Sequence, residues 1–191
     1  MPVLAQKGDK ALIMDNKVQA TLFWKTPVDL DLYCMYLPKG SPAPTQEKKG
    51  FFSKLVGGGS RGGTSGAGQI NFQRKGSLSR PPYIKLDQDS GIGDKVDSTQ
   101  GNEENMHFGD LGAVDCALIV ANIYGKSTNF AQYEGKVTVK GMGEPLEVPL
   151  SETKKGSWCV VAMIDNRTGT PHLVNVNKTM SKKPDIADFM I

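Results

Sequence analysis

The sequence predicts an all-β protein, a β-sandwich of two mainly antiparallel sheets. Three observations indicate this class. The apolar segments are short and rich in β-branched and aromatic residues, Gly, Pro, Asn and Asp separate them, and apolar and polar residues alternate with period 2 in segments such as 136–140. Many short strands separated by turn signals favour a sandwich over a barrel. The expected strands cover residues 18–24, 30–37, 69–72, 116–124, 136–140, 144–150, 158–164 and 172–176.

A single domain spanning residues 1–191 is expected, because a chain with 38% hydrophobic and 23% charged residues can form one core of ordinary composition. Residues 38–68 interrupt the strand pattern with many glycines and few apolar residues, which predicts a flexible insertion. A short C-terminal helix is expected within 182–191, where Pro184 and Asp185 suit a first turn.

The sequence predicts a cytoplasmic protein. The longest apolar run, 116–121, is far shorter than the roughly 20 residues of a transmembrane helix, so no transmembrane segment is expected. The first residues also lack the apolar region of a signal peptide. Cys34, Cys116 and Cys159 each lie alone in an apolar segment, which predicts buried free thiols in a reducing compartment.

Negative charge is concentrated in residues 87–104, which are expected to form a long acidic loop. This stretch carries six carboxylates and one lysine, a local charge of −5, although the whole chain has a formal net charge of +3. A compact loop of this kind needs water or a cation to offset its self-repulsion. Hard cations such as Ca²⁺ take oxygen ligands from Asp, Glu, Asn and backbone carbonyls, all of which the loop supplies. Its spacing does not match an EF-hand.

A second acidic element consists of Asp29 and Asp31. On a strand, residues two apart project from the same face, so both carboxylates should lie opposite Leu30 and Leu32. Two carboxylates on one face repel each other unless a positive charge lies between them. We therefore expect a cation between this strand and the acidic loop.

Other kinds of site are poorly supported. The two histidines, His107 and His172, have no zinc-ligand spacing with the scattered cysteines. The glycine-rich run has no P-loop pattern, and the lysines are dispersed, so no nucleic-acid partner is expected.

Four segments resemble elements of the TerD family of tellurium-resistance and calcium-binding stress proteins, in the family's order. DLDLYCMYL (29–37) resembles its FDLD strand, and the acidic stretch resembles its SGDN and GDDE loop elements. IVANIYGKSTNFAQ (119–132) resembles its IY and NFGQ signature, and PLSET (149–153) resembles its DLSE turn. The chain departs from the family in having Asn102 and Glu103 where GDDE has aspartates, and Ala131 in NFGQ.

The resemblance implies a calcium-binding β-sandwich without enzymatic activity, active in the stress response and tellurite-type resistance as a regulatory or assembly module. It also implies calcium ions and other proteins of a resistance complex as partners. Asp29 and Asp31 correspond to the FDLD aspartates, Asp89 to the aspartate of SGDN, and residues 101–104 to GDDE. The expected calcium ligands are Asp29, Asp31, Asp89, Asp94, Asp97, Asn102, Glu103 and Glu104.

Two alternatives remain open from the sequence. The first is a hydrolase in which Asp29, Asp31 and Glu103 hold Mg²⁺ or Mn²⁺ to activate water. The second is a metal-free interaction protein whose acidic loop serves solubility or docks a basic partner.

Overall fold

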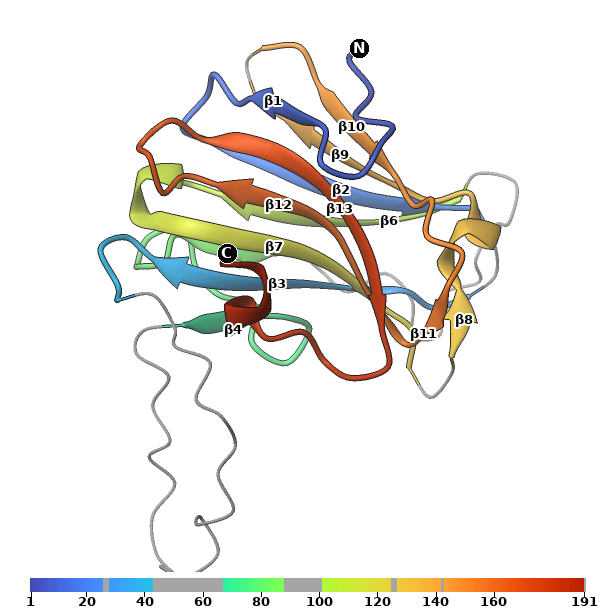
Figure 1. Cartoon of the computed structure of the whole chain (residues 1–191). Helices are drawn as coiled ribbons and strands as arrows, with labels where there is room; N and C mark the ends of the chain where they lie inside the picture. The colour runs from blue at the N-terminus through green and yellow to red at the C-terminus, as the bar shows by residue number, and fades with distance from the viewer. Residues whose placement is uncertain (26–27, 43–66, 88–100, 125–126, 142, 191) are drawn as a thin grey trace, which may run out of the picture.

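The architecture is described from a computed structural model, which describes residues 1–25, 28–42, 67–87, 101–124, 127–141 and 143–190. It confirms the predicted class: the protein is all-β, and two large antiparallel sheets pack together as two layers (Figure 1). None of the helices in the described part of the chain is long and apolar enough to span a bilayer.

In the described part of the chain, the first sheet has six strands and the second has five. In spatial order the first contains β1 (Lys10–Leu12), β13 (His172–Met180), β12 (Trp158–Asp165), β7 (Val114–Asn122), β3 (Asp31–Pro38) and β4 (Gly68–Ile70). The second contains β10 (Leu146–Pro149), β9 (Lys136–Lys140), β2 (Val18–Trp24), β6 (Asn102–Phe108) and β5 (Ile84–Leu86). A separate small sheet pairs β11 (Lys155–Gly156) with β8 (Thr128–Asn129).

Every expected strand is present, and β2 and β9 have the predicted bounds. β10 begins at Leu146, two residues later than predicted, and β13 continues to Met180. Five strands of the described ranges were not predicted. They are β1, β5, β6, β8 and β11.

The core lies between the two sheets because strand residues alternate between their faces. Leu22 on β2, Leu32 on β3 and Met106 on β6 are all at most 1% exposed and belong to this core. A second apolar cluster covers the other face of the six-stranded sheet, where Ile186 packs with residues such as Met35.

The expected C-terminal helix is a short 3-10 helix, η3 (Ile186–Phe189), which lies beside β3 and β4 (Figure 1). Asp185 caps it, since its side chain accepts a hydrogen bond from the Ala187 N–H at 3.0 Å. Pro184 therefore lies before the cap and not in the first turn as predicted. The other 3-10 helices among the described residues are η1 (Leu111–Ala113) and η2 (Phe130–Tyr133).

The three cysteines are buried free thiols, as predicted. Burial raises the pKa of the Cys116 and Cys159 thiols to about 12 and raises the pKa of Cys34 as well. These thiols are protonated at neutral pH and are poor nucleophiles and poor metal ligands.

Candidate metal-binding site

The first acidic element lies where the chain enters β3. Leu30 and Leu32 are at most 1% exposed and point into the core, whereas Asp29 is exposed and Asp31 is partly buried. This is the expected alternation, and it keeps the two aspartates away from the apolar interior.

The second acidic element differs from its prediction. Residues 102–105 do not continue a loop, because Asn102 begins strand β6. Glu104 is 2% exposed and points inward in line with Met106, whereas Glu103 is exposed on the other face. A strand was missed here because a charged residue occupies a core-facing position, which interrupts the apolar alternation that reveals a strand.

The two acidic elements converge beside the end of β2. Trp24, the last residue of β2, pairs with Asn102 in the sheet, and its indole Nε1–H donates to the Val28 carbonyl at 2.7 Å. The Leu32 N–H of β3 donates to Glu104 Oε2 at 2.6 Å, which links the two sheets directly. Residues distant in the sequence are thus held at one end of the sandwich.

Gly101 shapes the entry into β6. Its φ of +84° lies in the left-handed region, which favours glycine. A Cβ at this position would lie 2.5 Å from the Phe23 ring, so the backbone packs closely on that ring. This contact fixes the chain one residue before Asn102.

The remaining predicted ligands, Asp89, Asp94 and Asp97, lie outside the described residues. Asp87, at the edge of that stretch, has a partner of its own, because His107 Nε2 lies 2.8 Å from its Oδ2. Among the residues that the structure describes, no group of three or more His, Cys, Asp or Glu side chains is placed to hold a metal ion. Asp29, Asp31, Asn102 and Glu103 therefore need further oxygen donors to complete a calcium site.

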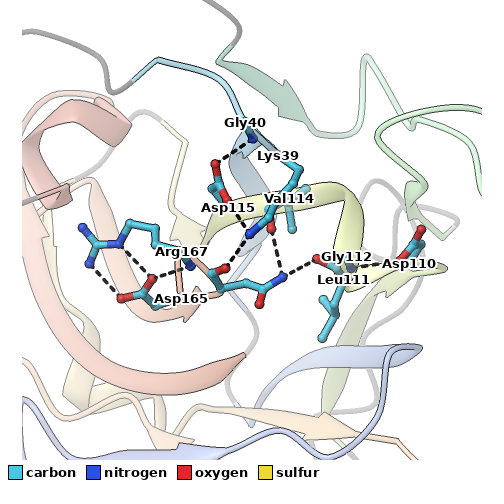
Figure 2. A network of polar contacts seen from close by, with 10 residues as sticks. Lys39, Gly40, Asp110, Leu111, Gly112, Val114, Asp115, Asp165 and Arg167 are labelled. Atoms are coloured by element: carbon cyan, nitrogen blue, oxygen red, sulfur yellow. Dashed lines mark hydrogen bonds and ion pairs between the residues drawn. The ribbon is translucent and has the colours of Figure 1, made fainter. Parts of the chain in front are cut away.

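Another group of acidic residues, not expected from the sequence, lies at the opposite end of β3 (Figure 2). Lys39 Nζ lies 2.8 Å from Asp115 Oδ1 and donates to the Asn166 carbonyl at 3.0 Å. The Gly40 N–H donates to the other Asp115 oxygen at 2.9 Å. The first residues of the predicted flexible insertion are thus anchored to the sheet.

The neighbouring carboxylate, Asp165, is paired within its own turn (Figure 2). Arg167 donates to both of its oxygens, through Nε at 2.8 Å and Nη2 at 2.7 Å. These hydrogen bonds hold the pKa of Asp165 below its ordinary value against the opposing effect of its partial burial. This end of the sandwich is therefore a closed structural network.

The sequence does place Asp115 and Asp165 beside the ends of predicted strands, at 116–124 and 158–164. It does not reveal their partners, because Lys39 comes from a segment whose composition predicts flexibility.

Comparisons with protein-family models, with curated proteins and with solved structures give no match. The resemblance to the TerD family therefore stays a prediction based on the four segments described above.

Proposed function

We propose that this chain is a calcium-binding, non-enzymatic protein of the TerD type, which acts as a regulatory or assembly module in the stress response and tellurite-type resistance. The observation that carries the proposal is the convergence of two acidic segments, 28–31 and 101–104, beside the end of β2. These segments contain four carboxylates and no lysine or arginine.

The chemistry of the donors suits a hard cation. Asp29, Asp31, Asn102 and Glu103 offer carboxylate and amide oxygens, which Ca²⁺ prefers. Glu104 has a different role, because its carboxylate binds the Leu32 N–H and so fixes β6 against β3. Ligands from Asp89, Asp94 and Asp97 remain part of the prediction.

A calcium ion bound to Asp29 and Asp31 would offset the repulsion between their carboxylates. Binding to the folded chain alone raises stability by RT ln(1 + [Ca²⁺]/Kd), about 2.7 kcal/mol when calcium is at 100 times Kd. The stability of the folded chain would therefore depend on the calcium concentration, which is the behaviour expected of a regulatory module.

The thiols support a non-enzymatic role, because their raised pKa values leave them protonated at neutral pH. The histidines are engaged separately: His107 with Asp87, and His172 through Nδ1 with the Thr170 carbonyl at 2.9 Å. A Cys–His nucleophile pair needs an accessible thiolate, and all three cysteines are buried.

Thermal unfolding of metal-stripped protein tests the proposal. We expect millimolar Ca²⁺ to raise Tm, and Mg²⁺ at the same concentration and ionic strength to raise it less. A Tm that does not respond to Ca²⁺ contradicts the proposal.

A metal-free interaction module is the second candidate, and the structural role of Glu104 favours it. If Glu104 serves folding, Asp29 and Asp31 would meet a basic partner instead of an ion. In that case neither Ca²⁺ nor Asp29→Asn with Asp31→Asn changes Tm appreciably.

A further inference from the structure

A groove lies on the far side of the six-stranded sheet from the core, between the edge strand β4 and the segment that leads into η3. Its volume is about 380 Å³, within the range of roughly 300–1,000 Å³ for small-molecule sites. Gly68 and Gln69 of β4 form one wall, and Lys183, Asp185 and Ile186 form the other.

Two cations face this groove. Arg74 is presented by a tight turn, in which the buried Asn71 side chain accepts hydrogen bonds from the Gln73 N–H at 3.0 Å and the Arg74 N–H at 2.9 Å. Lys183 reaches it from the C-terminal segment. Among the ion pairs of the described residues, none involves either side chain.

Lys183 is held in place by neutral groups. Its Nζ donates to Gln69 Oε1 and lies 5.8 Å from the centre of the Tyr33 ring. Burial, and then the positive charge of Arg74, lowers the pKa of Lys183. The ammonium is thus positioned at an electrostatic cost that an anion would remove.

The opposing charge in the groove is small. Asp185 is the one carboxylate among the described lining residues, and one of its oxygens is occupied by the Ala187 N–H. With Arg74 and Lys183 the lining has a net charge of about +1 at neutral pH, which favours an anionic ligand.

The apolar part of the lining limits what the ligand is. A Cβ on Gly68 would clash with the Tyr36 ring, so the β4 backbone that forms one wall packs closely on that ring. Met35 and Ile186 add an apolar surface beside the two cations. The groove volume of about 380 Å³ exceeds the volume of a bare phosphate ion.

We propose that this groove binds a small phosphate ester, with Arg74 and Lys183 contacting the phosphate and Met35 and Ile186 contacting the organic part. The guanidinium fork matches two phosphate oxygens, and the ammonium supplies a point charge to a third. The site is separate from the proposed calcium site, and its test does not depend on that proposal.

Titration with glycerol 3-phosphate tests this site, followed by ¹H–¹⁵N NMR at constant ionic strength because salt screens exposed charges. We expect saturable shifts centred on the Gly68 and Gln69 amides. Succinate, a dianion without a phosphate group, should bind at least about tenfold more weakly.

Four single variants, each of which removes one positive charge, distinguish binding in this groove from general attraction of an anion to basic residues. Arg74→Gln and Lys183→Gln should each weaken binding about tenfold, whereas Lys75→Gln and Lys182→Gln, neighbours that do not line the groove, should change it less than about twofold. Unchanged amide dispersion in each variant shows that it is folded. No saturable shift, equal weakening by all four variants, or succinate binding as tightly as the ester overturns the proposal.

Discussion

The two ends of strand β3 carry acidic residues in different settings. At its C-terminal end, Asp115 pairs with Lys39 and Asp165 with Arg167, so the fold supplies the compensating cations itself (Figure 2). At its N-terminal end, segments 28–31 and 101–104 contain four carboxylates and no lysine or arginine. The calcium proposal therefore assigns different roles to the two ends: the paired carboxylates stabilise the fold, and the others would bind an external cation.

Glu104 belongs to the N-terminal group but is buried and hydrogen-bonded within the fold. Its replacement should have the largest effect on the free energy of unfolding. Glu104→Ala removes the acceptor of the Leu32 N–H inside the sandwich, which should lower the free energy of unfolding by about 2–4 kcal/mol. Urea denaturation measures this change. Glu103→Ala, the exposed neighbour, should stay within about 0.5 kcal/mol of the parent. Equal effects of the two variants would remove the structural role assigned to Glu104.

The close packing of Gly101 on Phe23 can be separated from backbone strain. Gly169 has nearly the same φ, +82° against +84°, but a Cβ there would meet nothing within 4 Å. Gly169→Ala should therefore cost about 1 kcal/mol from strain alone, and Gly101→Ala at least about 1 kcal/mol more. Urea denaturation measures the free energy of unfolding of both variants. A Gly101→Ala variant as stable as Gly169→Ala would show that the Phe23 ring moves aside at little cost in free energy.

The Lys39 network predicts a smaller and purely structural effect. Lys39→Met removes the ion pair with Asp115 and the hydrogen bond to the Asn166 carbonyl, which should lower the free energy of unfolding by about 1 kcal/mol. The Tm increase produced by Ca²⁺ should remain unchanged. Loss of that increase in Lys39→Met would mean that the two ends of β3 are not independent.

The smallest expected effect is on the pH dependence of stability. Because the pKa of Asp165 is lowered in the folded state, the Arg167 pair contributes stability above the ordinary carboxyl pKa of about 4 and loses it as the pH falls below that value. Urea midpoints measured between pH 7 and pH 3 should fall less steeply for Asp165→Asn than for the parent. Identical slopes would contradict the assigned pairing.

The parts of the fold that the sequence predicted are those where apolar residues alternate regularly. β2 and β9 have their predicted bounds for this reason, and Leu30 and Leu32 correctly indicated which way the aspartates point. β6 was missed because Glu104 takes a core-facing position and the outward residues are polar.

The contacts between distant segments could not be predicted from one sequence. The Leu32–Glu104 hydrogen bond joins residues 72 positions apart, and no local pattern encodes it. Lys39 belongs to a glycine- and proline-rich stretch, and its anchoring depends on where the sheet places Asp115. Composition predicted an acidic region, but only the packing shows which carboxylate serves the fold.

Isothermal titration of metal-stripped protein with Ca²⁺, with Mg²⁺ as the control ion, tests the proposed calcium binding most directly. We expect saturable Ca²⁺ binding and weaker Mg²⁺ binding. Asp29→Asn with Asp31→Asn should abolish the calcium signal, whereas Asp115→Asn with Asp165→Asn, which removes the same charge from the other end of β3, should retain it. No calcium binding by the parent chain, or equal loss of the calcium signal in both double variants, would contradict a calcium site at the N-terminal end of β3.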